Sequence, residues 1–377
     1  MENLNSVCYV ATINEIKPIE GADNIELVVA GGWNAITKKG EFKVGDTTII
    51  ATTDAVIPES LSEQMGVTSY LRKGGRVRTV KLRGVYSECL IIPKHYLKGK
   101  ISMGDYDLKE GSDCMEFLSI TKFEPPVKMV QLASGKKIRY QDNPNFHVYY
   151  KFPNLKNVPD MFTNDDLVEI TRKIHGTNAR YGIVKKNKLS ILDRIKKFFG
   201  NKWAEYEFVV GSHNVEKGSD SNGFYDTNVW YEIEKKYNIK QKLWDYVKNE
   251  NVEIGDGITL YGEIYGAGIQ KGYEYGLNEI RFAGFDVKEC GEYLSTYNAW
   301  RVIENELELP YVEILHIGNW SQETQDRLVF NNFIEGTKVP HEGIVIKYHT
   351  GERPKIAKVI NPDYLIFAEK HNVGDSH

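Results

Sequence analysis

Residues 172–178 read Arg-Lys-Ile-His-Gly-Thr-Asn and directly follow an apolar strand pattern at 168–170. A lysine between a strand and a turn is a candidate nucleophile, because burial or a cationic neighbour such as Arg172 can lower its pKa. The same short pattern is also typical of a surface turn with a solvated lysine. Residues later in the chain must therefore decide between the two interpretations.

Four later stretches supply groups that complement such a lysine. They are Tyr-Gly-Glu-Ile-Tyr-Gly at 261–266, Arg-Phe-Ala-Gly-Phe-Asp at 281–286, Glu-Gly-Ile-Val-Ile-Lys at 342–347, and the lysines at 355 and 358. Glycines beside a carboxylate let a ligand approach closely. An aromatic ring can stack on a base, a second carboxylate can hold metal-bound water, and lysines can neutralise phosphates. The set indicates nucleoside triphosphate chemistry, although each acid can also be a surface pair and Phe285 a core residue.

The pattern from about residue 150 predicts a mixed α+β domain. Strands are expected at 181–184, 257–265, 281–288, 311–315 and 343–348. Helices are expected at 193–199 and, as one long element, at 229–250, where apolar residues recur at mostly helical spacing. Strands with inserted helices are typical of this class.

The first hundred residues predict a small β-barrel. Short strand patterns lie at 7–13, 25–29, 33–36, 47–51, 77–81 and 89–92, separated by turn residues and without a long helix. The OB fold is one such barrel and binds oligonucleotides, and another small barrel is the alternative. Prolines at 125–126 and the run Gln-Asp-Asn-Pro-Asn at 141–145 place a connector before a boundary near 140–150. Two domains suit a chain of 377 residues.

Two segments are locally basic. Between 72 and 100, nine Lys and Arg stand against Glu88 alone, with tyrosines at 70, 86 and 96. Cations interleaved with aromatic rings suit a groove that binds a single strand or tracks a nucleic-acid backbone, and a solvated strand edge is the alternative. Between 185 and 202, seven Lys and Arg stand against Asp193. This second run indicates a surface for a nucleic-acid backbone or, alternatively, a solvated helix face.

Composition excludes several classes of protein. The formal net charge of −4 excludes a globally basic chain but no local basic patch. The four cysteines are widely spaced without a Cys-x-x-Cys pair, which argues against a disulfide framework or a cysteine zinc site. The mean hydropathy of −0.43 and the lack of a long apolar run predict no membrane span. The N-terminus lacks a secretory pattern, so we expect a cytoplasmic protein.

The ordered motifs resemble the covalent nucleotidyltransferase superfamily, and most closely the ATP-dependent RNA ligases of the RNA ligase 2 type. In that type the lysine motif reads Lys-x-His-Gly-Thr-Asn, as at 173–178. The segments 18–23 and 38–46 resemble the OB module that precedes the catalytic domain in one branch of RNA ligases. The resemblance implies an OB-like RNA-binding module with connector at 1–140 and an adenylyltransferase domain at 148–377.

The resemblance also implies a three-step reaction. Lys173 would attack the α-phosphate of ATP, the AMP would pass to an RNA 5′-phosphate, and a 3′-hydroxyl would displace the AMP. Implied contacts to ATP or AMP are Lys173, His175, Gly176, Asn178, Glu263, Phe285, Lys347 and Lys358. Glu342, and Glu263 through water, would hold Mg²⁺ or Mn²⁺. Candidate RNA contacts are Arg180, His213, Arg76, Arg78, Lys81 and Arg83.

The expected partners are RNA ends or a nicked RNA duplex, with end-healing enzymes as further partners. We expect a monomer without a membrane partner. Two positions depart from the family pattern: histidine stands at 213 where arginine is usual, and no second lysine follows Lys358, which leaves Lys355 as a candidate replacement.

Other functions remain open at this point. One alternative is a non-catalytic RNA-binding protein with a vestigial nucleotide pocket. DNA ligases and mRNA capping guanylyltransferases share the lysine chemistry, but their OB domain usually follows the catalytic domain. Here the predicted barrel comes first, which favours an RNA ligase.

Overall fold

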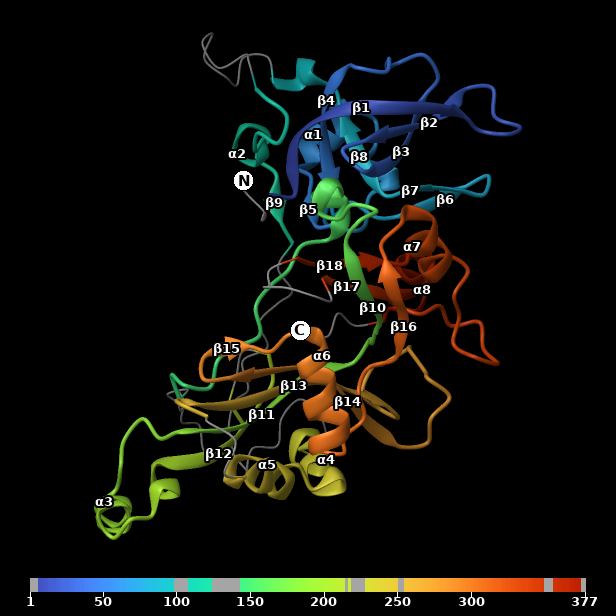
Figure 1. Cartoon of the computed structure of the whole chain (residues 1–377). Coiled ribbons are helices and arrows are strands. Elements are labelled where there is room, and N and C mark those ends of the chain that lie inside the picture. Colours follow the sequence, from blue (N-terminus) through green and yellow to red (C-terminus); the bar gives the residue numbers. More distant parts are fainter. Residues whose placement is uncertain are drawn as a thin grey trace. The chain divides into compact units, whose positions relative to one another are not determined.

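The computed structural model of the chain describes residues 6–97, 108–123, 143–213, 216–217, 228–249, 254–348 and 355–373. The chain forms two compact units (Figure 1). Unit 1 contains Met1–Pro126, Pro153–Met161 and Pro362–Glu369, and unit 2 contains Val127–Phe152, Phe162–Asn361 and Lys370–His377. A single cut between residues 140 and 148 therefore does not separate the units, because two later segments pack with the N-terminal one.

Unit 1 is built on a five-stranded antiparallel sheet in the order β3-β2-β1-β4-β8. The strands are β1 (Cys8–Pro18), β2 (Ile25–Ala30), β3 (Trp33–Lys38), β4 (Thr47–Thr52) and β8 (Cys89–Ile92). Strand β1 pairs with β4 through its first half and with β2 through its second half, and its pairing with β2 shifts register between Ile13 and Glu15. Such an irregularity bends a strand, so one strand serves two sides of a curled sheet. Five of the six predicted strands are present.

Shorter elements complete unit 1. They are β5 (Ala55–Val56), α1 (Glu59–Gln64), η1 (Thr68–Tyr70), β6 (Val80–Leu82), β7 (Val85–Ser87), η2 (Lys94–Leu97), α2 (Met115–Leu118), β9 (Thr121–Lys122), η3 (Leu155–Asn157) and η4 (Pro159–Met161). The strand expected at 77–81 is instead the start of the β6–β7 hairpin. Its two turn residues, Arg83 and Gly84, have φ of 49° and 81°. Two residues with positive φ form the turn that matches the twist of a hairpin.

The segment around η3 is fastened to the barrel by polar contacts. The Asn157 Oδ1 atom accepts hydrogen bonds from Trp33 Nε1 at 3.2 Å and from the Tyr9 hydroxyl at 3.3 Å. Lys156 forms an ion pair with the buried Glu88. These contacts are between residues more than 60 positions apart, so sequence patterning gives no indication of them.

Helix α8 (Pro362–His371) joins unit 1 from the far end of the chain. Its Glu369 carboxylate lies 3.1 Å from Arg78 Nη1, and its Asp363 Oδ1 atom accepts a hydrogen bond from the Tyr86 hydroxyl at 2.6 Å. Lys81 Nζ lies 3.6 Å from the same Asp363 oxygen. Arg78 and Lys81 of the basic segment therefore hold a helix of their own chain.

Unit 2 contains two antiparallel sheets. The first has the order β16-β10-β17-β18 and the second has the order β12-β11-β13-β14-β15. Their strands are β10 (Leu167–Lys173), β16 (Ile314–Asn319), β17 (Gly343–Tyr348), β18 (Ile356–Ile360), β11 (Thr177–Lys185), β12 (Tyr206–Gly211), β13 (Gly257–Gly266), β14 (Ile280–Glu289) and β15 (Glu292–Tyr293). The strand expected at 311–315 begins later, at Ile314, since Tyr311 forms an isolated bridge with Gly284.

Most helices of unit 2 lie on and around the second sheet, whereas α7 lies beside the first sheet (Figure 1). The helices are α3 (Ile191–Phe198), η5 (Lys202–Glu205), α4 (Val229–Tyr237), α5 (Ile239–Lys248), α6 (Thr296–Arg301), η6 (Val302–Glu306) and α7 (Gln322–Val329). Within the described ranges, no helix is long and apolar enough to cross a membrane. The main core packs α4 and α5 on one face of β11 and β13.

The single helix expected at 229–250 is wrong, because α4 and α5 are separate. They meet at Asn238, whose φ of 53° and ψ of 40° are left-handed. One such residue ends a right-handed helix and redirects the chain. The break lets Ile233 of α4 and both Ile239 and Leu243 of α5 become fully buried.

Replacing Asn238 tests this break. Asn238→Ala should lower the free energy of unfolding by about 1 kcal/mol, since alanine tolerates left-handed backbone poorly. Asn238→Gly should be nearly neutral. Chemical denaturation of both variants checks this. A stabilising alanine would instead support one continuous helix, where alanine is the better helix former.

Candidate active site

The pairing of β10 with β17 brings the candidate nucleophile to a carboxylate. Lys173 lies directly opposite Gly343, so Glu342 stands beside the lysine. The Lys173 Nζ atom donates to Glu342 Oε1 at 2.6 Å. A Cβ atom on Gly343 would lie 2.1 Å from the Val359 carbonyl oxygen of β18. Glycine at this position therefore lets β18 pair closely while Glu342 reaches the lysine.

Three predicted lysines project from the same face of the first sheet. Lys173 lies opposite Gly343, and Lys358 lies opposite Val345. Residues directly opposite each other share a face, and alternate residues along a strand do as well. Lys347 therefore lies on the face that carries Lys173 and Lys358. This grouping follows from strand register, which the sequence motifs alone do not specify.

The second sheet supplies Glu263 and Asn178, which lie directly opposite each other on β13 and β11. The turn between β10 and β11 passes close to them. A Cβ atom on Gly176 would lie 2.3 Å from the Ile264 carbonyl oxygen and 2.8 Å from Glu263 Cγ. Only glycine fits this approach, which brings the turn after Lys173 against Glu263.

Glu263 is electrostatically unusual. The pKa of its carboxyl is raised to about 8, mainly by burial; Lys173 and a hydrogen bond with Asn178 oppose this rise, and the nearby Glu342 adds to it. A carboxyl with this pKa keeps its proton at neutral pH and becomes charged only near pH 8. Perturbed groups of this kind are often found in functional sites.

Phe285 occupies a β-bulge. Tyr261 pairs with Asp286 whereas Gly262 pairs with Gly284, so Phe285 is the extra residue on β14. A bulge re-aims the side chain that it carries. The Phe285 ring is partly exposed and lies 5.0 Å from the ring of Tyr149, centroid to centroid. It is neither a fully buried core residue nor a regular strand residue.

Lys347 connects the two sheets at this bulge. Its Nζ atom donates to the Phe285 carbonyl oxygen at 2.6 Å and lies 3.6 Å from Asp286 Oδ2. Asp286 is fully buried and also accepts a hydrogen bond from the Tyr149 hydroxyl at 2.8 Å. These partners fix the ammonium group of Lys347 beside the aromatic ring.

Two tyrosines that the motif analysis missed hold the loops around Lys173. The Tyr275 hydroxyl accepts from the His175 backbone N–H at 2.8 Å and donates to the His175 carbonyl oxygen at 3.1 Å. The Tyr273 hydroxyl donates to the Pro340 carbonyl oxygen at 2.8 Å, just before Glu342. The signal available in the sequence is the paired tyrosines of Tyr-Glu-Tyr at 273–275, shortly after the motif at 261–266.

His175 itself is buried among these groups. Its ring lies 4.8 Å from the ring of Tyr273, and its Nδ1 atom lies 3.8 Å from Glu342 Oε2. Gln270 donates to the carbonyl oxygen of the next residue, Gly176, at 2.5 Å. The turn that follows the nucleophile is therefore held by backbone contacts on consecutive residues.

The oxygens of this region suit a hard cation. Glu342 Oε2 and Asn178 Oδ1 are buried, and neither has a hydrogen-bond partner among the described residues. Unpaired buried oxygens are costly, and Mg²⁺ or Mn²⁺ prefers oxygen ligands. No three His, Cys, Asp or Glu of the described ranges gather into a metal cage. The residues therefore fit a cation that keeps water and phosphate oxygens in its shell.

Arg180 is not placed as an RNA contact. Its side chain is buried, with Nε donating to the Ser212 carbonyl oxygen at 2.7 Å and Nη1 donating to the Phe146 carbonyl oxygen at 2.9 Å. The guanidinium group is thus used inside unit 2 and leaves no surface for a phosphate. Its neighbour in space, His213, follows Ser212 and is partly exposed.

The four residues of unit 1 that are candidate RNA contacts differ in whether their charge is already paired within the protein. Arg76 contacts Asp54 at 3.1 Å, and Arg78 and Lys81 face the carboxylates of α8. Arg83 is exposed at the tip of the β6–β7 hairpin and forms no ion pair with a described residue. Arg83 is therefore the best placed of the four to meet an external phosphate.

Two other cations lie away from Lys173. Lys355 Nζ binds both oxygens of Asp166 at 3.0 Å, which engages it in a pair of its own. Arg172 neighbours Lys173 along β10, so it points to the opposite face, where its Nε atom meets Glu313 Oε2 at 2.9 Å. Neither residue reinforces the site directly.

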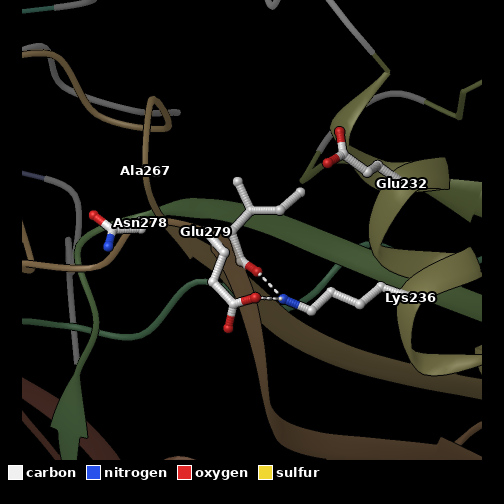
Figure 2. Close-up of a pocket in the computed structure, with 6 residues that line it drawn as sticks. Glu232, Lys236, Ala267, Asn278 and Glu279 are labelled. Carbon is white, nitrogen blue, oxygen red and sulfur yellow. Dashed lines mark hydrogen bonds and ion pairs between the residues drawn. The ribbon is translucent and has the colours of Figure 1, made fainter.

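A pocket between α4 and the start of β14 is separate from these groups (Figure 2). Lys236 points into it, but its Nζ atom is bound by Glu279 Oε2 at 2.9 Å and by the Ile280 carbonyl oxygen at 2.7 Å. None of the residues predicted to act in the site lines this pocket.

The raised pKa of Glu263 makes stability depend on pH. Between about pH 4.5 and 8 the folded protein keeps a proton that the unfolded chain has released, so this carboxyl lowers stability progressively as pH rises. Glu263→Gln should therefore gain thermal stability relative to the parent as pH increases from 5 to 8. Melting curves of metal-free protein in chelator test this, with the exposed Glu292→Gln as control. A difference that is constant with pH would contradict the assignment.

Comparison with solved structures shows a shared fold. A lysine-to-alanine mutant of Naegleria gruberi RNA ligase with ATP and Mn matches at 23% identity and a TM-score of 0.69, over 97% of this chain and 99% of that chain. The same ligase with PPi matches at 23% identity and a TM-score of 0.68, over 98% and 99%. A glutamate-to-alanine mutant with AMP and Mn matches at 23% and 0.70, over 98% and 99%.

Comparison with curated protein sequences gives no match. The model of an OB-fold domain matches residues 7–94, which confirms the fold expected for the N-terminal barrel. The RNA ligase model matches residues 166–360, slightly more than half of the chain, and this span contains Lys173, Glu263 and Glu342. The chain therefore belongs to the RNA ligase family, with an OB-fold module in front of its ligase domain.

Proposed function

We propose that the protein is an ATP-dependent RNA ligase that joins a 3′-hydroxyl end to a 5′-phosphate end through lysyl-AMP and RNA-adenylate intermediates. The observation that carries this proposal is the Lys173–Glu342 contact of 2.6 Å on a face that also bears Lys347 and Lys358. A nucleophilic amine beside a carboxylate, with cations for phosphate, is the arrangement that nucleotidyl transfer requires.

In the first step, the Lys173 nitrogen forms a bond to the α-phosphorus of ATP while the bond to the β-phosphate oxygen breaks. Pyrophosphate leaves, and the ammonium proton of Lys173 passes to Glu342 or to solvent. Glu342 Oε1, the acceptor of the hydrogen bond from Nζ, is already in place to receive it. The same contact orients the amine before ATP arrives.

Phosphate charge is met by the other lysines. Lys347 is held by Phe285 and Asp286 from the second sheet, so its ammonium group needs no reorganisation when charge develops. Lys358 lies on the same face. A Mg²⁺ or Mn²⁺ ion held by Glu342, and through water by Glu263, would add further neutralisation of the phosphates.

The adenosine would bind between the two sheets of unit 2. Phe285, re-aimed by the bulge, offers a ring for stacking on adenine. Glu263 and Asn178 offer polar groups for the ribose, and the closely packed Gly176 leaves room beside them. His175, fixed by Tyr275, completes the turn next to the α-phosphate position.

In the second step, an oxygen of the RNA 5′-phosphate takes the AMP phosphorus from Lys173, which regains its proton. In the third step, the 3′-hydroxyl oxygen attacks that 5′-phosphate and AMP leaves. We propose Arg83 and His213 as direct RNA contacts, since both are at least partly exposed. Arg76, Arg78 and Lys81 would contribute to RNA binding through the surface that they stabilise with α8 and Asp54.

Lys173→Ala tests the nucleophile. The variant should take up no label from ATP labelled in its α-phosphate, because the P–N bond cannot form, yet it should still seal RNA that already carries AMP on its 5′-phosphate. The exposed Lys235→Ala serves as a matched control that should label normally. Labelling from GTP but not ATP would indicate a capping enzyme, and an unlabelled parent would indicate a non-catalytic RNA-binding protein.

Tyr275→Phe tests the clamp on the His175 peptide. Loss of one hydroxyl removes both hydrogen bonds to that peptide while keeping the ring, so we expect adenylation at saturating ATP to fall about tenfold or more. The apparent KM for ATP should change much less than kcat. A purely structural role would lower the melting temperature and leave kcat of the folded protein unchanged. Tyr297→Phe, at an exposed ring, is the control.

A further inference from the structure

Helix α3 presents an apolar side to solvent. Phe198, Phe199 and Ile191 are 85%, 80% and 78% exposed, and Leu192 and Ile195 are exposed as well. The helix is nevertheless well formed, because Ser190 and Asp193 make a reciprocal capping box at its start. In Figure 1 it lies at the outer end of β11 and β12, away from α4 and α5 of the same unit.

The exposed apolar residues form one stripe with basic borders. At 100° per residue, positions 191, 192, 195, 198 and 199 fall within about 120° of the helix circumference. Arg194 lies next to one border of this stripe and Lys196 lies next to the other. The stripe therefore suits a partner that combines flat apolar surface with negative charge.

The cations around the stripe are incompletely neutralised. Lys186 pairs with Asp193 at 2.8 Å, and Lys197 pairs with Glu205 at 2.5 Å. The exposed side chains of Lys188, Arg194 and Lys196 make no ion pair or hydrogen bond with any residue that the structure describes. An anionic partner would complement this charge.

We propose that the α3 arm, residues 186–205, binds a single-stranded stretch of the RNA substrate at a distance from the ends being joined. In this role Arg194 and Lys196 contact backbone phosphates, while the rings of Phe198 and Phe199 stack on unpaired bases. The inference rests on the proposed function, because it places the same RNA on a second surface of unit 2.

Strand β11 fixes the spacing between this arm and the active site. Asn178 lies near its start, opposite Glu263, and Lys185 is its last residue. Seven residue steps of about 3.3 Å place the base of the arm about 23 Å from the site. At a spacing of roughly 3.4 Å per stacked nucleotide, the arm meets RNA about seven nucleotides from the join.

Other occupants fit the observations less well. A second copy of the chain could cover the stripe, but one helix of eight residues offers far less than the roughly 1,200 Å² of a stable interface. An anionic lipid surface also attracts basic amphipathic helices. RNA is favoured because the two most exposed residues are aromatic and because one strand joins the arm to the ligase site.

The test compares nicked RNA stem–loops with and without a single-stranded tail. The tail of ten nucleotides begins about six base pairs from the nick, on either side in separate substrates. Binding is measured by fluorescence anisotropy without ATP, and labelling by ATP is measured separately. The variants are Phe198→Ser with Phe199→Ser, and Arg194→Gln with Lys196→Gln. All four positions are exposed, so the melting temperature should stay that of the parent.

For the parent, we expect a tail on one side to tighten binding. The phenylalanine variant should lose this gain and bind the tailed substrate about tenfold or more weakly than the parent does. It should bind the substrate without a tail as tightly as the parent does. The charge variant should lower the slope of log K against log salt by about 1.4 for the tailed substrate, which is about 0.7 for each lost cation. Lys235→Gln with Lys338→Gln, two exposed lysines elsewhere in unit 2, should leave the gain unchanged.

Several results would overturn the proposal. In the first, the tail does not tighten binding by the parent. In the second, both arm variants keep the affinity gained from the tail. In the third, the control pair loses that affinity as much as the arm variants do. If the arm variants lose binding to phosphatidylserine vesicles but keep the parent's gain from the RNA tail, the arm binds a membrane and not RNA. Failure of the proposed function is distinguishable, since it appears as a parent that is not labelled by ATP, whatever the tail does.

Discussion

The ion pair between Lys173 and Glu342 depends on a single strand register, and the rest of the site is arranged around it. Lys173 lies opposite Gly343, and that glycine admits the β18 backbone so closely that a larger residue would displace the strand. If β17 slipped by one residue, Lys347 would point to the other face of the first sheet and lose its contacts with the second sheet. Lys173, Glu342 and Lys347 therefore share one geometric constraint, the pairing of β10 with β17.

That constraint explains which parts of the site could be predicted from sequence. The strands of both units are short apolar runs between turn residues, and most were located correctly because burial and turn chemistry are local signals. The order of the motifs that contain Lys173, Glu263 and Glu342 can likewise be read directly from the sequence. Register and bulges are not local: beside the extra residue Phe285, Gly284 bonds backbone atoms of Pro310 and Val312, more than 25 residues away.

The sequence did not indicate the structural roles of several residues. Arg180 stands among motif residues and carries a charge, yet it is used to hold the Ser212 and Phe146 carbonyl groups. Asn238 interrupts an otherwise regular apolar period, and asparagine is an ordinary helix residue until its backbone is seen to be left-handed. The tyrosines at 273 and 275 gave no signal as a clamp, because their partners are backbone atoms about 70 and 100 residues away.

The packing of α8 on unit 1 has a consequence for how the protein is made. The barrel begins at the first described residues, yet the carboxylates that meet Arg78 and Lys81 belong to almost the last ones. A ribosome delivers the N-terminal strands long before Asp363 and Glu369. During synthesis the barrel therefore remains without these two carboxylates until nearly all of unit 2 has been made. The two units therefore cannot be completed one after the other, because each includes residues from the end of the chain.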